Sequence, residues 1–283
     1  MAEQKKRKSL SFDTIDNLND LKKYLDSGAR LNNSQYLYQY TTVSALVNML
    51  RGKTMHLSNA KYMNDQLEYQ NGDPDIWENL FFSCFMMEED ESIGMWGMYA
   101  QPWRDGVKIS IHKDTLRRWI NETKELIEIS QETKQPTGKV ISGENAFRLW
   151  LSTVAYSNFD GVNVKDDEET LRCGGQENKI LKKVPHRPEL TGYIKDMAWS
   201  YEKAVRVKVQ FDNSVGFERV AIRMPDYVIE SMEITPSPLF EGDLMDRIEK
   251  EINHQMRTST SKFVGKLKIR SACDSCSIKL SQS

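Results

Sequence analysis

Hydrophobic residues along this chain follow two periods, one typical of strands and one typical of helices. Short runs in which apolar and aromatic residues occupy every second position predict strands. Longer runs with apolar residues three and four apart predict amphipathic helices. The expected strands are 36–41, 55–58, 80–87, 107–111, 199–209, 217–223 and 228–234. The expected helices are 13–27, 43–52, 93–100, 113–133, 144–151, 188–198 and 242–256.

This mixture of short strands and separated helices predicts an α+β fold rather than a doubly wound parallel sheet. We expect three parts: a basic end and helix over residues 1–35, a central domain over 36–240, and a helix with a polar tail over 241–283. Residues 157–176 are polar and contain glycine turn signals and an acidic run. We therefore expect a surface loop or lid there.

The charge of the chain is nearly balanced, with 39 Lys and Arg against 41 Asp and Glu and a net charge of -2. This balance gives no overall attraction to nucleic acid or to an anionic membrane, so any such contact must come from a local patch. The candidate patch is basic and consists of Lys179, Lys182, Lys183, His186 and Arg187. It is either an ordinary solvated stretch or a phosphate contact.

Compartment and metal content follow from what the sequence lacks. The longest apolar stretch, 80–87, is far shorter than the about 20 residues that span a bilayer, and residues 1–9 are basic with no apolar secretion signal after them. The 4 cysteines of a 283-residue chain do not indicate a disulfide framework. We expect a cytoplasmic protein with reduced thiols. Cys273-x-x-Cys276 is half a zinc site at best, so we expect no metal.

The predicted strand 199–209 has two unlike faces, because side chains alternate across a strand. With Lys203 as a polar exception, one face is apolar and is formed by Tyr201, Val205, Val207 and Val209. The other face is mostly charged and is formed by Glu202, Ala204, Arg206 and Lys208. Ala204 stands where a second carboxylate would complete a Glu-x-Glu pair. The charged face is either a site or a solvated charge cluster.

Three further clusters contain candidate site residues, and each also has a purely structural interpretation. Tyr38-Gln39-Tyr40-Thr41 is typical of an aromatic core strand. Ser58 is followed by Asn64-Asp65-x-x-Glu68, whose short polar side chains are typical helix caps. Trp96 and Tyr99 lie three apart on a predicted helix, where they either pack in the core or form a wall for a flat aromatic ligand.

In this order, the four clusters resemble a family of uncharacterised bacterial proteins with the motifs Tyr-x-Tyr-Thr, Asn-Asp-x-x-Glu, Trp-x-x-Tyr-Ala and a late Glu-Lys-Glu-x-Arg. The likeness covers residues 36–209. The opening strand, helix, glycine and second strand also resemble the start of the ADP-ribosyltransferase fold, which includes bacterial toxins that modify DNA. The resemblance implies a split, mixed or antiparallel sheet with flanking helices, and NAD as a substrate.

In that superfamily a His or Arg on the first strand, a Ser or Tyr on the second and a Glu on a later strand surround NAD. Carried onto this sequence, these positions fall on Gln39, on Ser58 or Asn64, and on Ala204. The resemblance implies an NAD cleft lined by Tyr38, Gln39, Tyr40, Thr41, Ser58, Asn64, Asp65, Trp96 and Tyr99. It implies a catalytic edge formed by Glu202, position 204 and Arg206.

The implied chemistry requires a carboxylate at that edge. Cleavage of the nicotinamide glycosidic bond builds positive charge on the ribose, and a nearby carboxylate is complementary to that charge. Loss of one preorganised electrostatic contact costs ~10² to 10³ in rate. Because Ala204 cannot replace a carboxylate, we expect the chain to be nearly inactive. Ala204 is then either a natural loss or an engineered substitution, and the otherwise intact Glu-Lys-x-x-Arg context favours the second.

The resemblance implies a bacterial toxin or anti-phage effector that transfers ADP-ribose to nucleic acid, or alternatively to protein, and that an inhibitory partner (an antitoxin) holds inactive. Two other functions stay open. One is a non-enzymatic module that binds nucleic acid or protein, in which the aromatic positions are core and Ala204 is native. The other is a hydrolase that acts on nucleotides and releases free ADP-ribose.

Overall fold

A computed structural model describes residues 18–27, 31, 34–65, 68, 73–87, 92–130, 132–133, 136–143, 146–157, 168–173, 177–182, 191–213, 215–255 and 268–269. The side chains of 168–173 and 177–182 lie outside this description. The predicted basic patch, the basic N-terminal end and the Cys273-x-x-Cys276 pair therefore lie outside the described residues or side chains.

One large sheet organises the described chain. Its strands are β1 (Tyr36–Thr42), β2 (Thr54–Asn59), β3 (Leu80–Met86), β4 (Gly106–His112), β5 (Glu125–Ile129), β6 (Pro136–Ser142), β7 (Arg148–Thr153), β12 (Ala204–Gln210), β13 (Arg219–Arg223), β14 (Glu233–Pro236) and β15 (Lys268–Ile269). The order is β15-β14-β4-β1-β3-β2-β13-β5-β6, with β12 paired to β3 and β7. All its pairs are antiparallel except β14 with β15.

The sheet splits at β3. This strand pairs with β12 along its whole length, with β1 at Met86 and with β2 at Phe81 and Phe82. Strands β1 and β2 therefore leave opposite ends of β3 and diverge. The split, mostly antiparallel sheet with flanking helices confirms the predicted α+β class.

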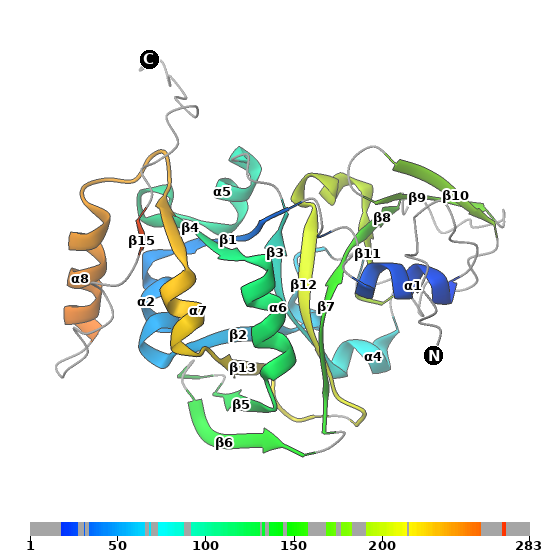
Figure 1. Cartoon of the computed structure of the whole chain (residues 1–283), viewed down its shortest axis with the longest axis horizontal. Coiled ribbons are helices and arrows are strands. Elements are labelled where there is room, and N and C mark those ends of the chain that lie inside the picture. The colour runs from blue at the N-terminus through cyan, green and yellow to red at the C-terminus, as the bar shows by residue number, and fades with distance from the viewer. Residues whose placement is uncertain are drawn as a thin grey trace, which may run out of the picture.

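A second, smaller sheet lies beside the start of β12. It consists of β8 (Ala155–Ser157), β9 (Glu168–Cys173), β10 (Glu177–Lys182) and β11 (Ile194–Asp196), in the order β10-β9-β8-β11. Figure 1 shows it next to α1 (Leu18–Ser27), at the end of the molecule opposite α8 (Leu244–Gln255). The expectation of a loop or lid over 157–176 was wrong for residues 168–173, because they form β9, which pairs with both β8 and β10. Residues 158–167 and 174–176 lie outside the described residues.

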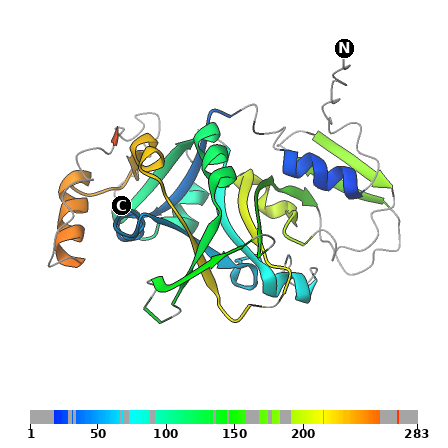
Figure 2. The same cartoon turned by 60° about the horizontal axis from the view of Figure 1, so that its bottom comes forward.

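Helices cover both faces of the large sheet (Figure 2). The main core lies between one face and α2 (Val43–Gly52), α6 (Lys113–Glu122), α7 (Asp226–Ser231) and α8. The opposite face carries α4 (Pro74–Asn79) and α5 (Ile93–Tyr99), with short 3₁₀ turns η3 (Ala60–Tyr62), η4 (Trp103–Asp105) and η6 (Met197–Glu202). Side chains cap the N-termini of two of these helices. Thr42 accepts a hydrogen bond from Ala45 N–H at the start of α2, and Ser92 accepts one from Met95 N–H at the start of α5, both at 3.3 Å.

Several predicted elements are confirmed within a residue or two, namely the strands at 36–41, 55–58, 80–87 and 107–111 and the helices at 43–52, 93–100 and 242–256. The described helices include none that is long and apolar enough to cross a membrane.

Other elements change type where pairing with distant strands outweighs local pattern. The predicted helix 113–133 ends at Glu122 and continues as β5, which pairs with β6 and β13. The predicted helix 144–151 overlaps β7, which begins at Arg148, and the predicted helix 188–198 contains β11 and the start of η6. The predicted strand 228–234 is divided between α7 and β14. The predicted strand 199–209 begins only at Ala204, because η6 extends through Glu202 and Lys203 adopts a left-handed conformation at φ 42°.

A tight turn at Gly192 presses the segment before β11 onto the large sheet. Gly192 has φ +76°, and a Cβ atom there would lie 2.7 Å from Phe82 Cζ and 2.8 Å from Leu80 Cδ2. Only glycine satisfies both the backbone conformation and the close approach.

We predict that Gly192→Ala destabilises the fold by about 1–3 kcal/mol, because it adds a left-handed non-glycine residue and a clash. Urea denaturation measures this. The matched control is Gly216→Ala, where an added Cβ meets nothing within 4 Å. Equal stability of the two variants would contradict the packing of this turn.

Candidate functional site

Strand β12 has the two faces that the sequence predicts. Val205, Val207 and Val209 belong to the main hydrophobic core. Residues 204, 206 and 208 lie on the other face, where Ala204 pairs with Met86 and Arg206 with Cys84 of β3. The charged side chains of this face are buried, since Arg206 and Lys208 are both 0% exposed. The face is therefore not a solvated charge cluster.

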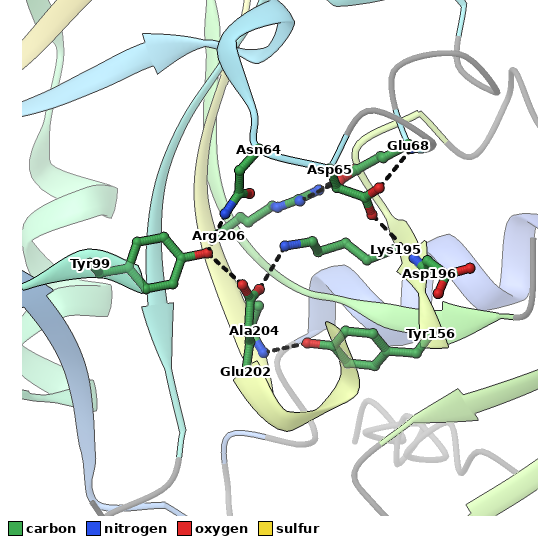
Figure 3. Close-up of polar contacts among 10 residues, drawn as sticks. All are labelled: Asn64, Asp65, Glu68, Tyr99, Tyr156, Lys195, Asp196, Glu202, Ala204 and Arg206. Carbon is green, nitrogen blue, oxygen red and sulfur yellow. Dashed lines mark hydrogen bonds and ion pairs between the residues drawn. The ribbon is translucent and has the colours of Figure 1, made fainter. Parts of the chain in front are cut away.

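A buried carboxylate, Glu202, forms the centre of a hydrogen-bonded cluster (Figure 3). Tyr99 Oη donates to its Oε1 at 2.5 Å, and Lys195 Nζ donates to its Oε2 at 2.7 Å. Asn64 Nδ2 donates to Tyr99 Oη at 2.8 Å. We call Asn64, Tyr99, Lys195 and Glu202 the Glu202 cluster. It joins a loop after β2, helix α5, strand β11 and the turn before β12.

The phenol of Tyr99 is a hydrogen-bond donor in this cluster. Burial, followed by the charge and hydrogen bond of Glu202, raises the pKa of Tyr99 well above its usual range. The hydroxyl group therefore keeps its proton at neutral pH and holds the Glu202 carboxylate in one orientation.

A buried ion pair lies next to the Glu202 cluster. Arg206 Nη1 and Nη2 donate to Glu68 Oε1 and Oε2 at 2.6 and 2.8 Å, and both residues are almost fully buried. Burial alone would lower the pKa of Arg206, but the Glu68 carboxylate raises it above the usual value. Asp65 accepts from Glu68 N–H at 3.2 Å and from Asp196 N–H at 3.3 Å. Asp65 thus fixes the backbone that presents Glu68, as the capping interpretation predicted.

Position 204 requires a correction. We expected Ala204 to line an open cleft, but it is 2% exposed and belongs to an apolar cluster with Val154 and Tyr156. Its N–H donates to Tyr156 Oη at 2.8 Å, and its carbonyl accepts from Val154 N–H at 3.0 Å. These contacts come from β8 and the residue before it, so the small sheet covers the start of β12.

The expected roles of Gln39 and Thr41 in the cleft were wrong. Tyr38 pairs with Met86 on the face that carries Ala204, so the neighbouring Gln39 faces the opposite side of the sheet. There its Nε2 lies 3.2 Å from Ser83 Oγ. Thr41 lies on the same side as Gln39, because strand positions two apart share a face. The sheet itself separates both residues from Glu202.

Tyr38, Tyr40 and Trp96 form a core beneath α5 rather than an open stacking wall. They are 3%, 5% and 1% exposed, and the rings of Tyr40 and Trp96 meet edge to face at 4.6 Å. This packing fixes α5 on the sheet, and Tyr99 at the end of α5 then reaches Glu202. Ser58 lies on the site face of β2, opposite Phe82 of β3.

Sequence reasoning missed three residues of the site. Lys195 was placed on a predicted helix but lies on β11, and Tyr156 lies on β8, which was assigned to no element. Cys84 lies opposite Arg206, and burial raises the pKa of its thiol. Only Cys84, within a predicted buried strand, carried a local signal for its position.

Comparison with known proteins adds one finding. No family model and no curated protein matches this sequence. Among solved structures, Thermus sp. 2.9 DarT in complex with carba-NAD+ is similar, with a TM-score of 0.32, 11% identity, and coverage of 83% of this chain and 95% of that chain. A TM-score of this size is too low to establish a shared fold.

The buried ion pair gives a stability prediction. Glu68→Gln leaves the Arg206 charge buried and uncompensated, so we expect a loss of about 3–5 kcal/mol in the free energy of unfolding. The double variant Glu68→Leu with Arg206→Met removes both charges and should recover most of that loss. The control Glu122→Gln removes an exposed glutamate from a surface ion pair and should leave stability unchanged.

Urea denaturation of the parent and the three variants measures these differences in the free energy of unfolding. A Glu68→Gln variant as stable as the parent would contradict the burial of this pair.

Proposed function

We propose that this chain is an NAD-dependent ADP-ribosyltransferase in which the Glu202 cluster contacts the nicotinamide ribose. The observation that carries the proposal is the meeting of three motifs that lie far apart in the sequence. Asn64, Tyr99 and Glu202, one from each motif, form a single hydrogen-bonded chain. The Asn-Asp-x-x-Glu and Glu-Lys-x-x-Arg motifs meet a second time in the Arg206 and Glu68 ion pair.

The geometry supports a carboxylate role for Glu202. Each of its oxygens accepts one hydrogen bond, which leaves lone pairs for a ribose hydroxyl. Exposure decreases along the cluster, because Asn64 is exposed, Tyr99 is half-buried and Glu202 is 5% exposed. A ligand would therefore approach from the side of Asn64. A carboxylate held in this way is complementary to the positive charge that develops on the ribose.

The proposed setting is a bacterial toxin or anti-phage effector in the cytoplasm. It transfers ADP-ribose to nucleic acid and is restrained by an inhibitory partner protein. This part of the proposal rests on the family resemblance of the motifs.

We propose further that the chain turns over slowly because Ala204 replaces a second carboxylate. Ala204 lies in a cluster that Trp199 packs against, and Lys195 Nζ lies 4.4 Å from the centroid of the Trp199 ring. A longer acidic side chain at 204 would have to displace part of this buried cluster to reach Lys195. Lys195 would then orient two carboxylates, where among the described residues it now pairs with that of Glu202.

We predict that Ala204→Glu raises the rate of NAD cleavage or ADP-ribose transfer by about 10² to 10³-fold. Chromatography of NAD and its products measures this rate. Adding Glu202→Gln should abolish the gain, whereas adding Glu122→Gln should leave it intact. Circular dichroism confirms that each variant is folded. A folded Ala204→Glu protein that is no faster than the parent would contradict the role of position 204.

A second candidate is a non-enzymatic module that binds nucleic acid or protein. The burial of Tyr38, Tyr40, Trp96 and Ala204 favours it, because these residues have structural roles in the core.

Thermal unfolding with NAD separates the two candidates. A ligand that binds only the folded state stabilises it by about 2.7 kcal/mol at a concentration of 100 Kd. We expect NAD to raise the unfolding temperature of the parent and to have a smaller effect on Asn64→Ala. A parent protein that is indifferent to millimolar NAD would favour the module.

A further inference from the structure

A second concave site lies away from the Glu202 cluster. This cavity of about 1020 Å³ is formed by α1, by β7, by the turn before β11 and by the second half of β12. Its lining includes Lys22, Asp26, Arg148, Trp150, Tyr193 and Lys208. No member of the Glu202 cluster is among its lining residues. Since Lys208 and Ala204 are four residues apart on one strand, the cavity lies ~13 Å along β12 from the start of that strand.

The lining of this cavity is positively charged. Lys22, Lys23 and Arg148 share this lining with a single carboxylate, that of Asp26, and Lys23 also pairs with Asp20 at 3.4 Å. Asp26 is already engaged, because its two oxygens accept hydrogen bonds from Trp150 Nε1 and Tyr193 Oη, each at 3.0 Å. In the described lining, positively charged side chains therefore outnumber carboxylates. An anionic ligand would be complementary to it.

Lys208 is the least expected member of the lining. Its side chain is fully buried, and its Nζ has no hydrogen-bond partner in the described part of the chain. Instead Nζ lies 3.1 Å from the centroid of the Tyr193 ring and 5.4 Å from that of Trp150. A buried amine without an acceptor is costly to a fold. An acceptor brought by a ligand would remove that cost.

We propose that this cavity binds the phosphate group of a nucleotide or of a single-stranded nucleic acid, with Lys208 as the buried recognition amine. Cations interleaved with aromatic rings are typical of proteins that bind nucleotides and single strands. Arg148 offers the planar fork that suits phosphate oxygens. The cavity is also at the upper end of the ~300 to 1,000 Å³ of small-molecule sites, larger than a simple inorganic ion requires.

Access to Lys208 depends on Tyr193. The phenol ring covers Nζ, and its hydroxyl group is held by Asp26. Tyr193 is only half-buried and lies on the turn at 191–193. Rotation of its side chain uncovers the amine to an anion in the cavity. Neither Glu202 nor NAD takes part in this site, so its test does not depend on the proposed enzymatic function.

The test is direct binding to the full chain in phosphate-free buffer without NAD. Fluorescence anisotropy measures a labelled 12-nucleotide single strand of DNA or RNA, and calorimetry measures AMP. Binding of the strand alone identifies nucleic acid as the ligand, and binding of AMP at comparable affinity identifies a free nucleotide. Binding of neither overturns the proposal.

Variants locate the site. Lys208→Met should weaken binding at least tenfold, and Lys208→Arg should retain most of it. Lys124→Met removes an equal charge from an exposed position on another surface and should leave affinity unchanged. Glu202→Gln should also bind normally, which separates this site from the proposed NAD site. A Lys208→Met protein that binds like the parent overturns the proposal.

The pH dependence of stability tests the burial of the Lys208 amine independently of ligand binding. Burial lowers the pKa of Lys208 well below its usual value, while Asp26 and Glu68 raise it and Arg206 and Lys22 lower it further. The unfolded chain binds this proton below about pH 10.4 more readily than the native chain does. The Lys208 contribution to stability therefore rises with pH. Lys208→Met should unfold at a higher temperature than the parent at pH 7, and the difference should shrink toward pH 10.

Discussion

The structure depends on the burial of charge along one face of β12. Glu202 precedes this strand, and Arg206 and Lys208 lie on it, yet all three are almost inaccessible to water. Buried charges destabilise a fold unless partners satisfy them. Lys195 and Tyr99 donate hydrogen bonds to Glu202, and Glu68 pairs with both terminal nitrogens of Arg206. Those partners come from β11, from α5 and from the segment after β2, so satisfying the charges holds distant parts of the chain together.

This constraint explains the role of the small sheet. Its strands β8 and β11 supply Tyr156 and Lys195, which contact the first residue of β12 and the glutamate before it. The small sheet therefore completes the site rather than covering it as a separate lid. The turn at Gly192 contributes by bringing the chain close to Phe82 just before β11 begins.

The sequence predicts the elements whose pattern is local. Strands β1 and β3 and helices α2 and α5 carry clear alternation or helical spacing, and their positions were correct. Leu126 and Ile127 fit a helix as well as a strand, and pairing with β6 and β13 decides in favour of the strand. The faces of β12 were predicted correctly for the same local reason. Whether a face is open or covered depends on segments about 50 residues away, as Val154 and Tyr156 show for Ala204.

The site residues likewise fall into two groups: those that a sequence motif identifies and those whose position depends on contacts between distant segments. Asn64, Tyr99 and Glu202 were proposed as separate motif residues, and the structure joins them by hydrogen bonds. Gln39 was proposed from its place in a motif, but the side of the sheet that it faces follows from the register of β1 on β3. Lys195 was missed because a lysine in a polar stretch carries no local sign that it will pair with a buried carboxylate. Contacts of this kind depend on tertiary structure.

The proposed function requires the Glu202 carboxylate to face the ribose of NAD. A crystal structure of the chain soaked with saturating NAD tests it most directly. We predict a nicotinamide-ribose hydroxyl within hydrogen-bond distance of Glu202, approached from the side of Asn64 and Tyr99. NAD bound elsewhere on the molecule, or a Glu202 still enclosed by Lys195 and Tyr99 with no ligand beside it, would contradict the proposed role of Glu202.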